Sequence, residues 1–486
     1  MDKKGTKFLY DYFVIGGGSG GLASAKKAAS LGKKVGIADF VKPSPYGTSW
    51  GLGGTCVNVG CIPKKLMHFT SSVGELRKDQ AEAGWEVDEE TPHNWERMRE
   101  SVTNHIKSLN WGYRTQMMKM GIKYYNALAS LSGPNTIKLV DKNDVVTEIT
   151  AEHILVAVGG RPRYLNVPGA KEHCISSDDL FWLEKAPGKS LVIGAGYIAT
   201  ECGGFLNGLG KEVDILYRSE ILRGFDKECV DKIVGFMTHY GVNFRKGNAY
   251  SFEKVDGRIK VTLTCEVDGK KVDSVEFYDT VLMAVGRYPD LGNLGLDNLG
   301  VELNDKGKVK VNEKWQTNVK GLYALGDIAS HGLELTPVAI KEGQYLAEGL
   351  FGNRWKTIDY DTICTTIFTP MEYSVCGLTE AQAISKYGED GVEVFYANSR
   401  PIEWQFDTSK PRTTYVKAIV HKENRKVVGL HYTGIHAGEV MQGYGIAMKC
   451  GLTWEEYKKT CAIHPTQSEG IVNLSQKKTS DQLIRN

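Results

Sequence analysis

Hydrophobic and polar positions follow a recognisable order at the start of the chain. An apolar run over residues 10–15 leads into a turn of five glycines and one serine over residues 16–21. Residues 22–29 are rich in alanine and lysine, which favour a helix, and a second apolar run covers residues 34–39. This order predicts a βαβ unit, which places its two strands parallel in one sheet.

The same order returns further along the chain. A run at residues 190–193 leads into a second glycine turn at 194–199, and another apolar run covers residues 212–217. Between the two units, the pattern predicts two long helices after Pro63 and a meander of short strands over residues 122–158. The second of these helices is expected to bury a stripe of Trp95, Met98, Val102, Ile106 and Leu109. The C-terminal part has no third unit and is predicted to be α+β.

The composition is that of a globular protein. Of 486 residues, 41% are hydrophobic, and the net charge is only +2, which argues against a nucleic-acid or membrane partner. No apolar run reaches the roughly 18–20 residues of a membrane span. Ten cysteines are too few for a secreted disulfide scaffold of this length, and the first residues contain no signal segment. We therefore expect a cytoplasmic protein, or alternatively a mitochondrial one whose presequence has been removed.

The first glycine turn has the spacing of a dinucleotide-binding fingerprint. Gly16 permits the tight turn, Gly18 lets the backbone approach a pyrophosphate, and Gly21 allows the helix to pack on the strand. The helix N-terminus favours phosphate, and an acid at the end of the next strand can bind a ribose hydroxyl. The residues expected at this site are Gly16, Gly18, Ser19, Gly20, Gly21 and Asp39, with a purely structural turn as the alternative.

The second glycine turn has the same fingerprint with a different ribose signal. Gly194 and Gly196 take the first two glycine positions, and Ala199 takes the third. No acid ends the next strand; Arg218 and Arg223 follow it instead. Arginines at this place suit a 2′-phosphate, so the second module is predicted to prefer NADPH, unless the two arginines are only solvated surface residues.

Two modules with different ribose signals predict two different nucleotides. We interpret the first as an FAD site and the second as an NADPH site. A further strand ends in Gly326-Asp327, which would bring the carboxylate of Asp327 close to the ribityl or phosphate groups of a flavin. Gly-Asp is also a common turn, so this assignment stays open.

Cys56 and Cys61 are close enough in the sequence to close a small disulfide ring, and we interpret them as a redox-active disulfide. Pro63 suits the first turn of a helix, so both cysteines are expected at a helix N-terminus, where the dipole and Lys64 favour thiolate. The alternatives are packed thiols or half of a zinc site, but no second close pair supplies zinc ligands, and we expect no metal. Near the C-terminus, His464 is a candidate base, oriented by Glu469.

These motifs resemble those of the class I pyridine nucleotide–disulfide oxidoreductases, and within them the high-molecular-weight, animal-type thioredoxin reductases. The most specific segments are 43–68, which contains both cysteines, and 108–114. The resemblance implies a glutathione-reductase-like α/β fold with two Rossmann-like nucleotide-binding domains and an α+β dimerisation domain. The implied limits are 1–163 and 291–362 for the FAD domain, 164–290 for the NADPH domain and 363–486 for the dimerisation domain.

The resemblance also implies a role for each matched residue. Cys61 would be the thiol that contacts the flavin, and Cys56 the thiol that exchanges with the next disulfide. Lys64 and Glu201 would form an ion pair beside the flavin, and His464 with Glu469 would serve the other subunit's cysteines in a homodimer. Further implied cofactor contacts are Thr55 and Gly159 for FAD, and Tyr197, Ile198 and Arg287 for NADPH, with the ring of Tyr197 covering the nicotinamide pocket.

The activity implied is NADPH-dependent disulfide reduction with thioredoxin as the protein substrate. A reductase of glutathione or another small disulfide is the alternative, and a flavin-bearing interaction protein is the alternative outside enzymes. Relatives of this type end in a tail with Gly-Cys-Cys-Gly or its selenocysteine equivalent, which passes electrons to thioredoxin. The sequence ends in Leu483-Ile484-Arg485-Asn486, so we expect a chain that lacks this tail and reduces thioredoxin poorly.

Overall fold

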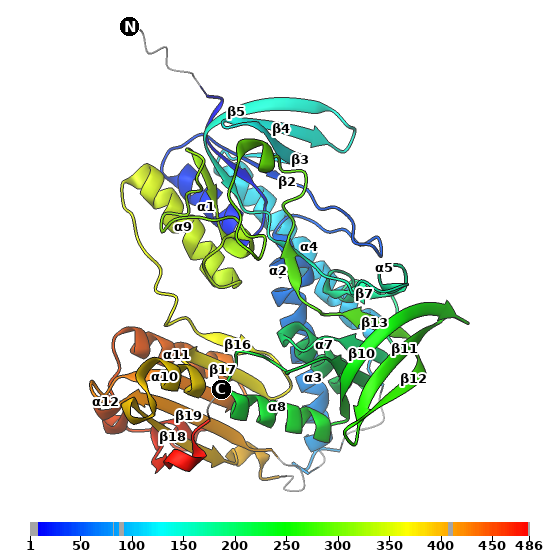
Figure 1. Ribbon diagram of the computed structural model, residues 1–486, viewed down its shortest axis with the longest axis vertical. Coiled ribbons are helices and arrows are strands. Elements are labelled where there is room, and N and C mark those ends of the chain that lie inside the picture. The colour runs from blue at the N-terminus through cyan, green and yellow to red at the C-terminus, as the bar shows by residue number, and fades with distance from the viewer. Residues whose placement is uncertain (1–7, 81, 87–91, 407–411, 485–486) are drawn as a thin grey trace.

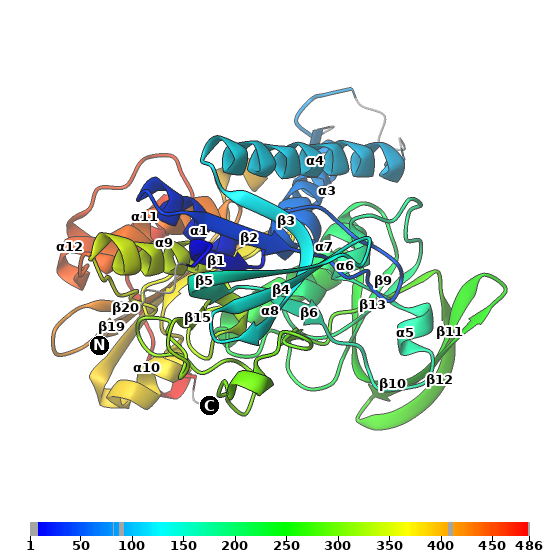
Figure 2. The same ribbon diagram turned by 90° about the horizontal axis from the view of Figure 1, so that it is seen from above.

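The computed structural model describes residues 8–80, 82–86, 92–406 and 412–484. Two mixed sheets and one antiparallel sheet organise this part of the chain. In Figure 1 the first sheet lies at the top, the second at the lower right and the third at the lower left. The long helices α3 (Cys61–Gln80) and α4 (Trp95–Lys119) lie side by side, as the turned view of Figure 2 also shows.

The first sheet confirms the βαβ unit predicted at the start of the chain. Its parallel strands lie in the order β3-β2-β1-β5-β15, and β4 pairs antiparallel with β3 and β5 to form the predicted meander. Helices α1 (Ser19–Ser30) and α9 (Thr336–Gly352) pack against each other beside this sheet. The strands are β1 (Tyr10–Ile15), β2 (Val35–Asp39), β3 (Lys123–Gly133), β4 (Thr136–Asp141), β5 (Val146–Val156) and β15 (Leu322–Ala324).

The second sheet repeats this plan. Its parallel strands lie in the order β10-β9-β8-β13-β7, and β11 and β12 extend it as an antiparallel meander. The repeated module predicted from the glycine turns is therefore confirmed. The strands are β7 (Ile175–Ser176), β8 (Ser190–Ile193), β9 (Val213–Tyr217), β10 (Val242–Val255), β11 (Arg258–Val267), β12 (Lys270–Tyr278) and β13 (Thr280–Met283), and a separate pair consists of β6 (Gly160–Pro162) and β14 (Arg287–Pro289).

The third sheet is antiparallel in its described strands, which agrees with the α+β prediction for the C-terminal part. Its order is β16-β17-β20-β19-β18-β21. The strands are β16 (Thr365–Ile367), β17 (Glu372–Gly377), β18 (Val392–Ser399), β19 (Thr414–His421), β20 (Val427–Gly434) and β21 (Gln476–Lys477). Strand β15 follows the whole second sheet in the chain but pairs within the first sheet. The first sheet is therefore built from two separate stretches of chain. The domain limits themselves stay a prediction.

Helices cover the sheets and carry most of the candidate site. The apolar stripe predicted on α4 is buried at Trp95, Met98, Val102 and Ile106, and Leu109 packs against the same core. The other α-helices are α2 (Gly54–Val59), α5 (Ala170–His173), α6 (Ser177–Leu180), α7 (Tyr197–Gly208), α8 (Lys227–His239), α10 (Glu380–Tyr387), α11 (Ala437–Lys449), α12 (Trp454–Lys459) and α13 (Ser468–Val472). Short 3₁₀ helices are η1 (Asp297–Leu299), η2 (Gly326–Ile328), η3 (Glu389–Gly391), η4 (Ile402–Trp404) and η5 (Ser480–Gln482). Within the described ranges, the structure contains no helix that is both long and apolar enough to cross a membrane.

A buried ionic cluster joins the start of α8, which belongs to the second nucleotide-binding module, to the third sheet. The Nζ of Lys417 on β19 is fully buried and lies 2.8 Å from Oδ1 of Asp226 and 2.6 Å from Oε2 of Glu380. Glu228 on α8 and Lys478 complete the cluster, with their charged atoms 2.8 Å apart. Because a buried charge is costly unless it is paired, the cluster depends on α8 lying against the third sheet.

Candidate active site

The first glycine turn has the geometry that close approach to a ligand requires. Gly16 has φ +113°, and a Cβ there would lie 2.4 Å from the carbonyl oxygen of Ala157. A Cβ on Gly21 would lie 2.0 Å from the carbonyl oxygen of Gly16, so any larger residue would separate α1 from the turn. Gly18 is the N-cap of α1, and Ser19 and Gly20 begin the helix. The first N–H groups of a helix have no acceptor within the helix, which suits this helix start to a phosphate.

Asp39 ends β2 and is fastened to the same turn. Its Oδ1 accepts a hydrogen bond from the backbone N–H of Gly17 at 2.8 Å. Burial raises the pKa of Asp39, and the Gly17 hydrogen bond opposes that rise. In the β2–β3 register, Asp39 lies opposite Asn126. The carboxylate of Asp39 thus holds the first glycine turn by one hydrogen bond, and this position is compatible with its predicted role in binding a ribose hydroxyl.

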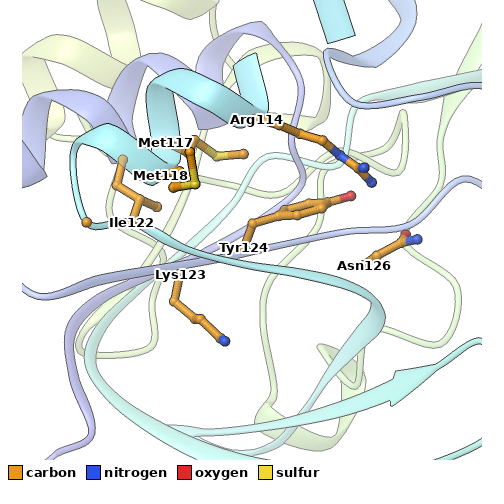
Figure 3. Close-up of a pocket in the computed structure, with 8 residues that line it drawn as sticks. Arg114, Met117, Met118, Ile122, Lys123, Tyr124 and Asn126 are labelled. Carbon is orange, nitrogen blue, oxygen red and sulfur yellow. The ribbon is translucent and has the colours of Figure 1, made fainter. Parts of the chain in front are cut away.

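A cavity of about 610 Å³ opens beside Asn126 (Figure 3). Tyr124 and Asn126 on β3 form one wall, and Arg114 and Met117 from the end of α4 form another. The guanidinium carbon of Arg114 lies 5.4 Å from the centre of the Tyr124 ring. An aromatic face and a guanidinium plane are surfaces on which a flat, polar ring can stack.

The second glycine turn repeats the geometry of the first. Gly194 has φ +148°, and a Cβ there would lie 2.2 Å from the carbonyl oxygen of Ala284. Gly196 is the N-cap of α7, and no atom outside its own turn approaches within 4 Å of the position its Cβ would take. Tyr197 and Ile198 are the first two residues of α7. This open helix start is again suited to phosphate.

Arg218 and Arg223 lie on the loop after β9 and are exposed. The loop folds back onto the second glycine turn, because the N–H of Leu222 donates to the carbonyl oxygen of Ala195 at 2.7 Å. Arg223 donates to the hydroxyl of Ser219 at 2.8 Å and forms a long ion pair, 3.8 Å, with Glu220. Both arginines are exposed on the loop beside the second glycine turn, and their role in choosing the nucleotide stays a prediction.

Cys56 and Cys61 lie at the starts of two separate helices. The sequence predicts one helix for both, but Cys56 is the third residue of the short helix α2, and Cys61 is the first residue of α3. Pro63 lies in the first turn of α3, as predicted. The break comes from Gly60, where a Cβ would lie 2.9 Å from the carbonyl oxygen of Thr55. Both cysteines are free thiols.

The pKa values of the two thiols are shifted in opposite directions. A hydrogen bond from Cys56, helped by the charge of Lys64, lowers the pKa of Cys61 to about 6 against the opposing effect of burial. The same hydrogen bond and burial raise the pKa of Cys56. The hydroxyl of Thr336, at the start of α9, lies 3.7 Å from the sulfur of Cys61. Cys61 is therefore the thiol that the site keeps as thiolate near neutral pH.

Lys64 and Glu201 form a buried ion pair next to this thiolate. The Nζ of Lys64 lies 2.8 Å from Oε1 of Glu201, and that oxygen also accepts the N–H of Phe368 at 2.8 Å. The Nζ of Lys64 lies 4.5 Å from the centre of the Phe368 ring. Burial would lower the pKa of Lys64, but Glu201 outweighs it and raises that pKa, so the amine stays charged. The ion pair joins α3 to α7 across the two nucleotide-binding modules.

Asn58 holds the cysteine loop in place. Its side-chain amide donates to the carbonyl oxygens of Gly51 and Gly54, at 3.1 and 2.9 Å. Its own Oδ1 accepts from the amide of Asn110 on α4 at 3.0 Å, and its backbone oxygen accepts from the indole of Trp182 at 3.0 Å. Asn58 is fully buried, and a buried polar side chain needs partners such as these. Its place between the two cysteines is the signal in the sequence that could have identified it.

Other predicted cofactor residues gather around Arg287. Its guanidinium donates to the hydroxyl of Thr55 at 3.3 Å and to the carbonyl oxygen of Gly160. Burial raises the pKa of Asp327 on η2, and the positive charge of Arg287 opposes that rise, so Asp327 also lies within the electrostatic influence of Arg287. The structure thus brings Arg287, predicted at the NADPH site, beside residues predicted at the FAD site. Gly159, next to Gly160, has φ +70° and open space at its Cβ position.

Tyr197 and Glu201 lie four residues apart on α7 and so share one face of that helix. Burial and the charge of Glu201 raise the pKa of Tyr197, while Arg287 opposes that rise. As a whole residue, Tyr197 is 42% exposed. The role of Tyr197 in covering the nicotinamide pocket stays a prediction.

His464 and Glu469 form a pair of their own at the surface. The Nδ1 of His464 lies 3.1 and 3.0 Å from the two carboxylate oxygens of Glu469, and a hydrogen bond from His464 lowers the pKa of that carboxyl. The His464 side chain is 80% exposed. Within the described residues of this one chain, no hydrogen bond or ion pair joins His464 to Cys56 or Cys61. In the same ranges, no three His, Cys, Asp or Glu side chains gather as a metal site would need.

Comparison with known proteins agrees with the geometry. Residues 10–343 match the family described as pyridine nucleotide-disulphide oxidoreductase, and residues 363–475 match its dimerisation domain. The chain therefore belongs to the pyridine nucleotide-disulphide oxidoreductases, which are NAD(P)H-dependent flavoprotein enzymes, and the resemblance found in the sequence is confirmed. One relative, thioredoxin reductase SEP1 of Emiliania huxleyi, is 47% identical over 481 residues, covering 97% of this chain and 96% of the relative.

Proposed function

We propose that this chain is a thioredoxin reductase that works as a homodimer, with NADPH as electron donor and FAD as prosthetic group. Electrons would reach the Cys56–Cys61 pair and then thioredoxin, by way of a C-terminal redox tail. The observation that carries the proposal is the low-pKa thiol of Cys61, held beside the Lys64–Glu201 pair where two nucleotide-binding modules meet. The relative's name supports thioredoxin as substrate, and the matched dimerisation domain supports the homodimer.

The residues of the first module fit FAD. The turn from Gly16 to Gly21 would hold the pyrophosphate at the start of α1, and Asp39 would bind a ribose hydroxyl. The cavity lined by Arg114 and Tyr124 would accept the adenine ring. Thr55, Gly159 and Asp327 would lie along the rest of the cofactor. When bound, FAD supplies the chemistry that converts a hydride from NADPH into an electron pair for a disulfide.

The second module fits NADPH for two reasons. Gly194 and Gly196 leave the start of α7 open to a pyrophosphate, and Arg218 and Arg223 are exposed on the loop that folds back beside it. No acid ends β9 to bind a 2′-hydroxyl, so the module lacks the feature that favours NADH. Tyr197 would cover the nicotinamide pocket, and Arg287 would act between the two cofactors.

The cysteines divide the work by their acidity. Cys61 is the thiolate that the site stabilises, and Cys56 is the thiol that exchanges with the substrate disulfide. In each exchange, the Cys56 sulfur attacks one substrate sulfur, the substrate S–S bond breaks, and the leaving sulfur takes a proton. Cys61 then attacks the sulfur of Cys56, which releases the second substrate thiol and restores the Cys56–Cys61 disulfide. His464 of the partner subunit would hold and deliver the proton, oriented by that subunit's Glu469.

The experiment compares three acceptors with NADPH as donor: thioredoxin, oxidised glutathione and a small aromatic disulfide. Residues 1–486 are assayed alone and extended by Gly-Cys-Cys-Gly. We expect both forms to reduce the small disulfide, only the extended form to reduce thioredoxin efficiently, and neither to reduce glutathione. Efficient glutathione reduction would support the small-disulfide reductase instead. Reduction of none of the three would favour the flavin-bearing interaction protein.

A matched variant separates the two halves of the proposal. Cys56→Ser should abolish reduction of every disulfide yet leave bleaching of the flavin by NADPH intact.

The compartment stays a prediction; ten free thiols fit a reducing compartment such as the cytoplasm.

A further inference from the structure

A second pair of cysteines lies face to face in the dimerisation domain. Strands β16 and β17 form an antiparallel hairpin in which Thr366 pairs with Ser374. The side-chain oxygens of Thr366 and Ser374 lie 2.8 Å apart, so residues paired in this register meet on one face of the hairpin. Continued by one residue, this register sets Cys364, which directly precedes β16, opposite Cys376 and on the same face, because side chains in a strand repeat every two residues.

The two sulfurs converge on a single glycine of the covering helix. A Cβ on Gly445 of α11 would lie 2.2 Å from the sulfur of Cys364 and 3.8 Å from the sulfur of Cys376. Opposed residues of antiparallel strands have Cα atoms about 4.5–5.5 Å apart, which is inside the roughly 4.4–6.8 Å range that a disulfide spans. A bond between these sulfurs therefore needs no movement of the strands, and Gly445 leaves it room.

The two thiols differ in access and acidity, as a reactive pair should. Cys364 is half-buried and its sulfur lies 3.7 Å from the carbonyl oxygen of Met441, whereas Cys376 is fully buried. A hydrogen bond from Cys376 lowers the pKa of Cys364, and the same contact together with burial raises the pKa of Cys376. Cys364 is thus the more accessible and the more acidic of the two thiols, and so the one that an oxidant should reach first.

We propose that Cys364 and Cys376 form a second, reversible disulfide that hydroperoxides oxidise. The Cys364 sulfur attacks one peroxide oxygen; an S–O bond forms, the O–O bond breaks, and the leaving oxygen departs with a proton as water or alcohol. The Cys376 sulfur then attacks the Cys364 sulfenic acid; the S–S bond forms, the S–O bond breaks, and water leaves with the Cys376 proton. Two electrons pass from the sulfurs to the peroxide, and a dithiol returns them by thiol–disulfide exchange.

This disulfide would act on the same hairpin that supports the active site. Phe368 follows β16 at the turn of the hairpin, and its N–H donates to Glu201, the partner of Lys64. Cys364 and Cys376 lie at the open end of that hairpin. Oxidation would therefore fasten the open end of an element whose closed end holds the ion pair beside Cys61. The inference does not depend on which substrate the enzyme reduces.

Peptide mapping tests the proposal directly, because the tryptic peptide 357–386 contains Cys364 and Cys376 and no other cysteine. The reduced holoenzyme is treated with hydrogen peroxide, blocked with iodoacetamide and digested. We expect this peptide to appear without alkyl groups and two hydrogens lighter, and to regain two alkyl groups after dithiothreitol. A second cleavage, after Glu372, should give two fragments that stay joined until they are reduced.

Variants assign the two roles. In Cys376→Ser, dimedone should trap a sulfenic acid on Cys364 at a level at least about tenfold above the wild type, since the resolving thiol is missing. In Cys364→Ser, Cys376 should stay reduced. Cys450→Ser, at an exposed cysteine on the end of α11, is the control and should leave the disulfide unchanged.

Two results would overturn the proposal. One is a fully alkylated peptide 357–386 in protein whose Cys56 and Cys61 are completely oxidised. The other is oxidation of Cys364 no faster than that of Cys450. Both readouts come from the wild-type enzyme, so they decide the matter even if Cys376→Ser does not fold.

Discussion

Replacing Lys64 by methionine tests how far the charge of Lys64 adds to the hydrogen bond from Cys56 in lowering the pKa of Cys61. The variant removes the positive charge next to the thiolate but keeps an unbranched side chain of similar length. Lys64 lowers the pKa of Cys61, whereas the negative charge of Glu201 raises it. The loss of Lys64 leaves Glu201 without its partner, so both effects move the pKa of Cys61 in the same direction, upward.

The magnitude follows from the pKa of Cys61, about 6. A nearby opposite charge moves a pKa by about 1 to 3, so Lys64→Met should bring that pKa to between about 7 and 9. At pH 7 the thiolate fraction of Cys61 would then fall from about 90% to between about 50% and 1%. Glu201→Gln should act in the opposite sense and lower the pKa of Cys61.

The assay is the rate at which iodoacetamide alkylates Cys61 in the reduced protein as a function of pH, with the modified peptide quantified by mass spectrometry. Lys65→Met is the matched control. Lys65 is the next residue and lies over the same Phe368 ring, 3.9 Å from its centre, but it pairs with Glu372 instead of Glu201. The reasoning is refuted if Lys64→Met leaves the midpoint unchanged, or if Lys65→Met moves it equally.

Three further predictions concern the nucleotide and the docking of the domains. Replacing Arg218 and Arg223 together by alanine should raise KM for NADPH at least about tenfold and leave KM for NADH unchanged, because a charge-assisted hydrogen bond contributes about 1.5–3 kcal/mol. Lys417→Met should lower the free energy of unfolding, measured with denaturant, by about 3–5 kcal/mol, whereas the exposed control Lys227→Met should cost less than about 0.5 kcal/mol. Burial acts to raise the pKa of Glu372, but its basic partners on α3 hold that pKa at about 2. A carboxyl whose pKa is lower in the folded than in the unfolded state stabilises the fold at pH values above its unfolded pKa. Thermal unfolding should therefore show this contribution disappearing as the pH falls from about 4 to 2. An unchanged KM ratio, a cost for Lys417→Met no larger than the control's, or an identical acid profile in Glu372→Gln would each contradict its prediction.

The sequence could predict the two modules because their signals are local. A strand, three glycine positions and a helix start lie within about 25 residues in each module, and the spacing alone carries the geometry of a nucleotide-binding turn. The apolar stripe of α4 is local in the same sense. The separate helix around Cys56 was missed, because six residues give no reliable periodicity and because the close approach of the Thr55 carbonyl to the Cβ position of Gly60 is not visible in the sequence.

The long-range part of the site could not be predicted from patterns. Thr336 lies beside Cys61, and the ring of Phe368 lies beside Lys64, although each comes from a segment some 300 residues away and carries no local signal for that contact. Pro337 marks the start of α9 and could have located that helix, but not what the helix touches. The hydrogen bond from Arg287 to Thr55 joins residues more than 200 positions apart, so it depends in the same way on how distant segments of the chain pack together.

Anaerobic titration of the purified flavoprotein with NADPH tests the central claim most directly. The account predicts that the visible absorption of the flavin bleaches and that a long-wavelength band develops as the Cys61 thiolate forms beside the flavin. Cys61→Ser should lose this band while NADPH still bleaches the flavin. A wild-type protein that shows no bleaching by NADPH, or bleaching without the long-wavelength band, would contradict electron transfer to the Cys56–Cys61 pair.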